Sequence, residues 1–179
     1  MKLLIASDIH GSVTAVRKVL AAAERHGCKR IVLLGDLYYH GVRNVLPEGY
    51  APAEVAAALN AVKDRLLVVR GNCDSEVDQM VSEFVFNDSA EILLGEHVIL
   101  CTHGHVYNGA KLPPFGGYDI LLHGHTHVCG VWERDGVTVI NPGSTMIPKQ
   151  DTPASYCVLD EQSATLYTLD GEQFFEAAL

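Results

Sequence analysis

Five short apolar runs in this chain each end in an aspartate, histidine or asparagine that has a glycine beside or close to it. The first run, residues 3–6, leads into Asp8, His10 and Gly11. A short apolar run that stops at a glycine turn is typical of a buried β-strand. Alternate residues of an extended chain share one side, so we expect Asp8 and His10 to reach the same bound group. For this stretch alone, the alternative is a polar loop with a solvated aspartate and a surface histidine.

The same pattern recurs four times along the chain. The later polar ends are Gly35-Asp36, Gly71-Asn72, Thr102-His103-Gly104-His105 and His123-Gly124-His125-Thr126-His127. Ligands of α/β proteins collect at the carboxyl ends of strands, so all five ends are expected to converge. The glycines let the backbone turn tightly and come close to a bound group.

Helical and extended patterns divide the chain into two halves. Apolar spacing predicts helices over residues 13–26, 53–63 and 75–81, the first with Ser12 as N-cap and Gly27 as C-cap. The first strand, this helix and a strand over 31–34 favour a parallel pair with a right-handed crossover. Further strands are expected at 66–69, 91–94, 98–101, 120–122, 130–134, 137–140, 155–160 and 164–169, with hairpin turns at 95–96, 135–136 and 162–163. We therefore expect two sheets packed on each other, with helices outside.

One long loop interrupts this rhythm. Residues 37–52 contain two glycines and two prolines directly after the second strand end. A loop of this length at such a position is more often functional than decorative.

The composition bounds the class of protein. The 179 residues suit a single domain over 1–179, and no apolar stretch reaches the roughly 18 residues of a membrane span. The net charge of −9 argues against stable nucleic-acid binding, because that needs lysine and arginine to neutralise phosphates. The five cysteines show no C-x-x-C pair and no export signal precedes them, so we expect a cytoplasmic protein without disulfides.

The chemistry of the strand ends indicates a metal centre. Carboxylate and imidazole groups with one amide oxygen suit borderline-hard ions such as manganese, iron or zinc. A single histidine is usually a core or surface residue, but seven such residues at strand ends make that explanation improbable for the whole set. They are too many for one catalytic ion and fit two ions that share a carboxylate, as in phosphoryl transfer. The seven candidates are Asp8, His10, Asp36, Asn72, His103, His125 and His127.

These residues resemble the pattern of the calcineurin-like metallophosphoesterases, namely D-x-H, G-D, G-N-x-[DE], a later H, and G-H-x-H. The matches are Asp8-Ile9-His10, Gly35-Asp36, Gly71-Asn72-Cys73-Asp74, His103 and Gly124-His125-Thr126-His127. The segments GNCDSEVDQM, LPEGYAP, THGH, GHTH, NPGS and IPK further resemble the small bacterial YfcE-type phosphodiesterases.

The resemblance implies a four-layer αββα sandwich of two packed mixed β-sheets flanked by helices. It implies a first ion held by Asp8, His10, Asp36 and His127, and a second held by Asp36, Asn72, His103 and His125, with Asp36 bridging. Manganese is the first expectation for both, with iron, zinc, nickel or cobalt as alternatives. A bridging hydroxide would then attack the phosphorus of a small phosphodiester in line. The resemblance also suggests a homo-oligomer, a dimer or a tetramer.

The catalytic expectations concern Asn72, His103, Cys73 and Asp74. Many relatives place a histidine after the asparagine, where it protonates the leaving alkoxide, and here Cys73 takes that position. A thiol is a weaker acid catalyst, so we expect poor hydrolysis of esters with poor leaving groups and a preference for phosphodiesters with acidic leaving groups, such as aryl esters. Asp74 either orients Cys73 or a ligand, or is a plain turn residue.

Five further residues are candidates for support or substrate contact. His105 and His123 lie close to metal ligands in the sequence, and His40 and Arg43 lie in the long loop. A supporting or surface role for these histidines is at least as plausible as catalysis, and the arginine has a solvated alternative. Asn141, in the NPGS segment, is expected to accept the second ring N–H of a ligating histidine.

Other functions compete with a phosphodiesterase. A nuclease or a phosphomonoesterase would use the same site. The superfamily also includes a retromer subunit with this fold and an altered site, which makes a non-catalytic scaffold an alternative. A thiol enzyme built on Cys73 is a fourth hypothesis, with no further support in the sequence.

Overall fold

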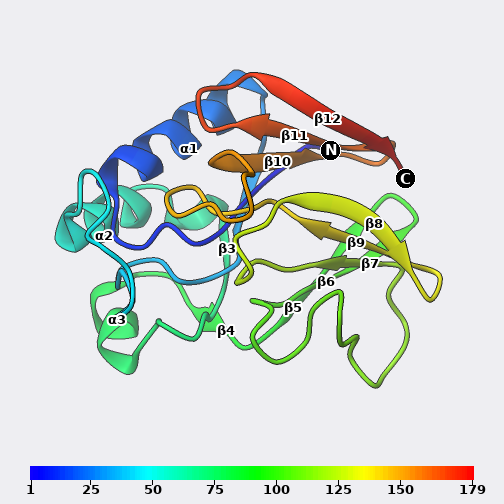
Figure 1. Cartoon of the computed structure of the whole chain (residues 1–179), viewed down its shortest axis with the longest axis horizontal. Helices are drawn as coiled ribbons and strands as arrows, with labels where there is room; N and C mark the ends of the chain where they lie inside the picture. The colour runs from blue at the N-terminus through cyan, green and yellow to red at the C-terminus, as the bar shows by residue number, and fades with distance from the viewer.

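The computed structural model describes residues 1–179 and contains two β-sheets packed face to face (Figure 1). The seven-stranded sheet has the order β12-β11-β10-β1-β2-β3-β4. Its strands are β1 (Leu3–Ala6), β2 (Arg30–Leu33), β3 (Leu66–Val69), β4 (Phe86–Asn87), β10 (Ser155–Leu159), β11 (Ser163–Thr168) and β12 (Gln173–Ala178). The five-stranded sheet has the order β5-β6-β7-β9-β8. It contains β5 (Ala90–Leu94), β6 (His97–Cys101), β7 (Ile120–Leu122), β8 (Gly130–Arg134) and β9 (Val137–Asn141).

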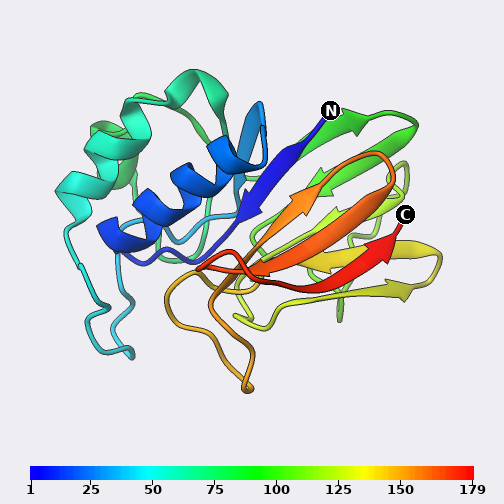
Figure 2. The same cartoon turned by 90° about the horizontal axis from the view of Figure 1, so that it is seen from above.

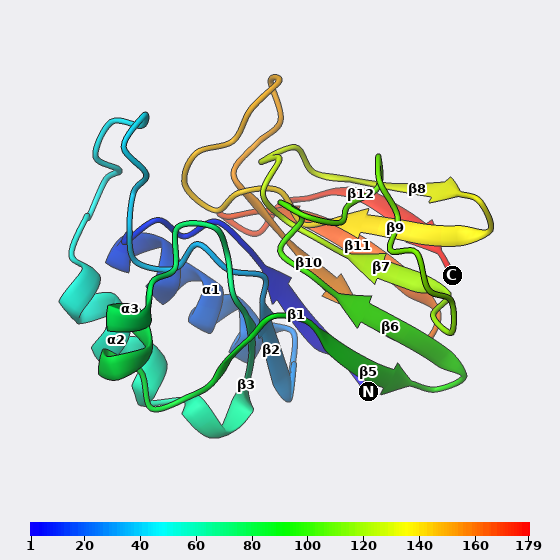
Figure 3. The same cartoon turned by 90° about the horizontal axis from the view of Figure 1, so that it is seen from below.

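Three helices cover the outer face of the larger sheet, as the views from above and below show (Figures 2 and 3). They are α1 (Val13–Arg25), α2 (Pro52–Asn60) and α3 (Glu76–Val81). Ser12 caps α1 as predicted, because its Oγ accepts a hydrogen bond of 3.1 Å from the N–H of Ala15. The predicted parallel pairing of the first two strands through this helix is confirmed.

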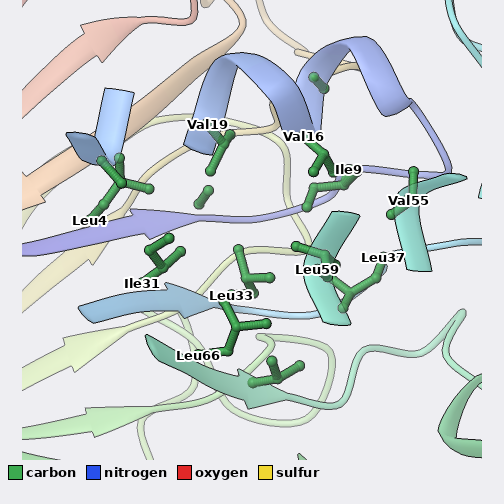
Figure 4. Close-up of a cluster of buried hydrophobic side chains, with 14 of the residues drawn as sticks. Leu4, Ile9, Val16, Val19, Ile31, Leu33, Leu37, Val55, Leu59 and Leu66 are labelled. Carbon is green, nitrogen blue, oxygen red and sulfur yellow. The ribbon is translucent and has the colours of Figure 1, made fainter. Parts of the chain in front are cut away.

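The alternation of side chains along the strands sends apolar groups to both faces of the larger sheet. Leu4, Ile31 and Leu33 point toward α1 and α2 and form a buried cluster with Val16 and Leu59 (Figure 4). The neighbouring residues of the same strands point the other way and pack against the smaller sheet. That second core includes Leu3, Ile5, Val32, Ile99, Ile120 and Ile140.

The fold class predicted from the sequence is confirmed, with one difference in its fourth layer. The outer face of the five-stranded sheet carries a small cluster of Leu100, Leu121 and Val139. Leu112 and Tyr118 pack on that cluster, and they belong to a segment between β6 and β7 that contains no helix. Helices therefore flank the sandwich on one side, and irregular chain closes the other.

The remaining differences concern edges and ends. The sequence did not indicate β4 and β12, because one has two residues and the other is an edge strand that is mostly exposed. The predicted helix over 53–63 ends at Asn60 and continues as a separate 3₁₀ turn, Lys63–Arg65. None of the helices has the length and apolar character to cross a bilayer.

Candidate metal centre

The site lies where parallel strands of both sheets end. β1, β2 and β3 run parallel in one sheet, and β6 and β7 run parallel in the other. Main-chain hydrogen bonds tie neighbouring ends together, from the N–H of Asp8 to the carbonyl of Gly35 and from the N–H of Gly124 to that of His103. The turns after these five strands carry all seven candidate ligands.

The first group of ligands surrounds one oxygen of Asp8. Oδ1 of Asp8 lies 3.2 Å from Nε2 of His127 and 3.7 Å from Nε2 of His10. Oδ2 of Asp36 lies 3.8 Å from the same His10 nitrogen. Asp8, His10 and Asp36 are almost completely buried, and His127 is only slightly exposed. The ligand atoms of Asp8, His10 and His127 therefore lie within 4.8 Å of one another, and Asp36 lies beside His10.

The second group surrounds Nε2 of His103. This atom lies 3.0 Å from Oδ1 of Asn72 and 3.5 Å from Oδ1 of Asp36. The ring of His125 is close by, with its centroid 5.1 Å from that of His103. Asp36 thus directs one carboxylate oxygen toward each group, which is the arrangement that a bridging ligand needs.

Three of the histidines are held in one tautomer by the main chain. The Nδ1–H groups of His10, His103 and His127 donate to the carbonyls of Tyr39, Leu34 and Ile147, at 2.7, 2.6 and 2.6 Å. A carbonyl oxygen only accepts, so each Nε2 is left with a lone pair directed into the site. Ligating histidines are normally oriented in this way.

The residues present fit a cation. Oδ1 of Asp8 is buried and has no hydrogen-bond partner, although an orphaned buried acceptor is costly. The nitrogen lone pairs beside it would repel it unless a positive charge lies between them. Burial alone would disfavour the charged forms of Asp8 and His127, yet the pairing of these two groups raises the pKa of His127 and holds that of Asp8 well below its usual range.

Backbone strain is concentrated at the same positions. Five of the eight non-glycine residues with positive φ are Asp8, His10, Asp36, His125 and His127, with φ between 50° and 66°. The left-handed region costs such residues about 1 kcal/mol each, and strain of this kind clusters at functional sites. β1 ends at Ala6, so Asp8 and His10 share a side because of a strained turn. The extended chain assumed from the sequence is the wrong reason for their proximity.

Two glycines let the strand ends approach each other. A Cβ on Gly71 would lie 2.1 Å from Oδ1 of Asp36. A Cβ on Gly124 would lie 1.9 Å from Oγ of Ser7, whose hydroxyl donates to Oδ2 of Asp8. A side chain at either place would push a carboxylate out of the site.

Asp74 lies beneath the site and joins two strand ends. Its carboxylate accepts hydrogen bonds from the N–H groups of Asp36, Leu37 and Gly71, at 2.7, 2.8 and 2.7 Å. Burial, together with the charge of Asp36, raises the pKa of Asp74 to about 6 against the effect of these bonds. Asp74 does not line the cavity above the metal ligands, so its position is that of a support.

Cys73 lies on the cavity wall and is half-buried. Its N–H donates to Oδ1 of Asp36, and its Sγ accepts a hydrogen bond of 3.3 Å from Nδ2 of Asn72. Burial and the nearby carboxylates, chiefly Asp36, raise the pKa of the thiol to about 12. The thiol is therefore a weak acid in direct reach of the site.

The other sequence candidates lie at different distances from the centre. His105 is exposed, and its ring centroid lies 6.2 Å from that of His125. His123 is buried on the far side, where its Nε2 accepts from the N–H of Gly109 and its ring packs edge-on against Trp132. His40 contacts Tyr50 through a long hydrogen bond of 3.4 Å. None of these histidines lines the cavity.

Asn141 supports the turn that carries His125. Its Nδ2 donates to the carbonyl of Gly124 and to Oγ1 of Thr126, at 3.1 and 2.9 Å. The sequence predicts that it holds the ring N–H of a ligating histidine. Main-chain carbonyls do so instead for His10, His103 and His127, because the loops cross directly behind these rings.

A cavity of about 640 Å³ opens above the ligands. Its walls come from the metal-site turns, from Tyr39 and residues 41–44 of the long loop, and from Lys149. Arg43, a candidate for substrate contact from the sequence, therefore lines this cavity. Lys149 was not singled out from the sequence, because a lysine in a polar loop carries no signal of its own.

Comparison with known proteins identifies the family of this chain. Residues 1–164 match the family model of the calcineurin-like phosphoesterase superfamily domain. The chain is 44% identical to the phosphodiesterase YfcE of Escherichia coli K12 over 96% of this chain and 94% of that protein. The solved structure of the E. coli phosphoesterase Yfce superposes with a TM-score of 0.94 at 43% identity, over 99% of both chains.

A more distant likeness concerns the fold alone. Vacuolar Protein Sorting 29 from Cryptosporidium parvum has a TM-score of 0.65 at 21% identity, over 99% of this chain and 97% of that one. The family model and the E. coli relative together cover nearly the whole chain, in agreement with the motifs at the strand ends. The chain belongs to the calcineurin-like phosphoesterase superfamily.

Proposed function

We propose that this protein is a phosphodiesterase that holds two divalent ions and hydrolyses small phosphodiesters. The observation that carries the proposal is Asp36, which directs Oδ2 toward His10 and Oδ1 toward His103. The activity named for the E. coli relative, at 44% identity, supports the same reaction class.

The two donor groups define the two ion sites. Asp8, His10, Asp36 and His127 would hold the first ion, and Asp36, Asn72, His103 and His125 the second. Nitrogen and oxygen donors without a thiolate suit manganese first, with iron, zinc, nickel or cobalt as alternatives. When bound, the ions would acidify a water molecule and neutralise the phosphoryl oxygens.

The protein's own groups prepare this site for its substrate. The carbonyls of Leu34, Tyr39 and Ile147 keep three imidazoles oriented, so little reorganisation is needed on binding. Asp74 holds the turns of Asp36 and Gly71 together, which we assign as positioning rather than proton transfer.

The departing arm receives little acid assistance. Cys73 occupies the cavity wall and can donate a proton only from Sγ–H, which is a weak acid. His105 and His123 do not line the cavity, so neither replaces it in this structure. We therefore expect the enzyme to prefer diesters whose leaving group is stable as an anion, such as aryl esters.

Metal content and activity measured on the same preparations test the proposal. Wild type loaded with manganese should bind two ions per chain and hydrolyse bis(p-nitrophenyl) phosphate. Asp8→Asn should lose one ion and Asp36→Asn both, each with roughly 100-fold or greater loss of kcat/KM. Asp64→Asn, an exposed aspartate outside the site, is the matched control.

Three results would redirect the assignment. Inactivity with every divalent metal, despite bound ions, would favour a non-catalytic scaffold. Faster turnover of monoesters would favour a phosphomonoesterase, and cleavage of polynucleotides would favour a nuclease. The net charge of −9 argues against the last of these, since long polyanions would be repelled.

The proposal also includes the cellular location and the oligomeric state. All five cysteines are free, in keeping with a cytoplasmic location. A dimer or tetramer stays a prediction, which light scattering coupled to size exclusion tests.

A further inference from the structure

We propose that Arg43 and Lys149 form a two-cation clamp that binds a second phosphate group on one arm of the diester. The proposal rests on the phosphodiesterase function above and names a substrate class for it: phosphodiesters that carry an additional phosphate.

Both cations reach the same cavity from different loops. Arg43 and Lys149 are the only arginine and lysine among the twelve residues that line it. Residues 37–51, between β2 and α2, and residues 142–154, between β9 and β10, project on the same side of the molecule (Figures 2 and 3). An anion in the cavity would therefore lie between the two loops.

The loops are fixed to the metal site by the main chain. The carbonyl of Tyr39 accepts from Nδ1 of His10, and that of Ile147 accepts from Nδ1 of His127. The N–H of Lys149 also donates to the carbonyl of His127 at 3.0 Å. Since Nε2 atoms of the two histidines lie 3.4 Å apart, both loops flank the same corner of the site. Each of the two loops therefore orients one histidine of the first ion site and also carries one of the two cations.

The loop backbones are ordered close to these cations. Nδ2 of Asn44 donates to the carbonyl of His40 at 2.8 Å, and its N–H donates to that of Gly41. Oγ1 of Thr152 donates to the carbonyl of Lys149 at 2.8 Å. The backbones that carry the two side chains are therefore preorganised, and only the side chains need to be ordered on binding.

The two charges have no partner within the protein. The lysine and arginine side chains that form ion pairs in this chain are six others, namely Arg17, Lys18, Lys63, Arg65, Arg70 and Arg134. Both Arg43 and Lys149 are exposed. In a chain of net charge −9, two free cations at the mouth of an anion site match a negative group of the ligand.

That group is separate from the reacting phosphate. A phosphodiester carries a single negative charge, which two divalent ions already neutralise. Additional cations are useful when the substrate carries a further charge away from the ions. A second phosphate is the group for which an arginine fork beside a lysine is best suited.

Two substrates that differ in one phosphate test the clamp. They are thymidine 5′-(p-nitrophenyl phosphate) and the same ester with an added 3′-phosphate. Manganese-loaded wild type should hydrolyse the second with a roughly tenfold higher kcat/KM. Arg43→Gln with Lys149→Gln should bring the ratio of the two values near one. Lys29→Gln with Arg30→Gln, a pair of exposed cations outside the cavity, should keep it.

A binding measurement separates the clamp from the chemistry. In calorimetry with the same proteins, wild type should bind thymidine 3′,5′-bisphosphate roughly tenfold tighter than thymidine 5′-phosphate, and the double variant should not. Equal affinities in wild type, or an equal loss for both ligands in the variant, would overturn the clamp in favour of general electrostatic attraction. If wild type binds the bisphosphate more tightly but hydrolyses neither ester, the phosphodiesterase assignment is wrong and the clamp proposal stands.

Discussion

The Nε2 atoms of His10 and His127 lie 3.4 Å apart, and each ring already donates its other N–H to a main-chain carbonyl. Their lone pairs face each other and the unpartnered oxygen of Asp8 in a buried place. These two nitrogen atoms and the carboxylate oxygen repel one another unless a cation lies between them. A cation bound at this place is therefore expected to stabilise the fold.

Removal of metal should accordingly lower thermal stability. At a free ion concentration of 100 times Kd, binding adds about 2.7 kcal/mol, which corresponds to a Tm increase of roughly 5–10 °C for a chain of this size. Scanning calorimetry of chelated protein, with and without added manganese, measures this shift. If no divalent metal changes Tm, the donor groups do not form an ion site.

The sequence indicates the candidate ligands because they are chemically distinctive. Aspartates and histidines that repeatedly follow apolar runs mark the strand ends, and topology brings those ends together. The φ values of Asp8 and His10 were not predictable, because an i, i+2 spacing fits both an extended strand and the turn that exists.

Main-chain groups account for most of what the sequence did not show. The carbonyls of Leu34, Tyr39 and Ile147 orient the imidazoles, and every residue has a carbonyl, so no residue type signals this role. Lys149 was missed for a related reason. Its proximity to the site depends on how the loop after β9 folds back toward His127.

Gly71→Ala should disrupt the site through volume alone. The added Cβ would lie 2.1 Å from Oδ1 of Asp36 and 2.4 Å from its backbone nitrogen, so backbone must shift. We expect a loss of about 3 kcal/mol in the free energy of unfolding, together with weaker metal binding. Gly116→Ala is the control, since a Cβ there has no neighbour within 4 Å. Equal urea midpoints for both variants would contradict the close approach.

Asp74→Asn should loosen the junction between two strand ends. An amide offers one acceptor oxygen and places an NH₂ group against main-chain N–H donors, so at least one of three hydrogen bonds is lost. The expected cost is about 2–3 kcal/mol in urea unfolding, with roughly tenfold weaker metal binding. Asp64→Asn provides the comparison, and wild-type metal affinity in Asp74→Asn would refute the positioning role.

A pH effect is expected at the start of β7, away from the metal centre. Burial opposes ionisation of Asp119, but hydrogen bonds from Nδ1 of His97 and the N–H of Val98 together outweigh it and lower its pKa. A depressed pKa stabilises the fold above the unfolded value of 3.8, and this contribution disappears as the pH falls through the folded pKa. The stability difference between wild type and Asp119→Asn should therefore shrink in urea titrations from pH 6 to pH 3. Solvent exposure limits it to about 1 kcal/mol. If the difference in stability between the two proteins does not depend on pH, it arises from packing and not from the charge of Asp119.

Cys73→His should change which leaving groups the enzyme accepts. Cys73 lies on the cavity wall, and its Sγ is 3.8 Å from where a Cβ of Gly41 would stand, so an imidazole can extend into the cavity rather than into the core. An imidazolium there would protonate a departing alkoxide, a step for which the thiol is too weak an acid.

General acid assistance contributes about 10²–10⁴-fold where the leaving group is poor, and little where it is an aryl oxide. The ratio of kcat for a dialkyl ester such as dimethyl phosphate to that for bis(p-nitrophenyl) phosphate should therefore rise at least tenfold. Cys73→Ala, which supplies no proton, should leave that ratio at the wild-type value or below. A parallel change for both esters in Cys73→His would show that the thiol does not limit departure.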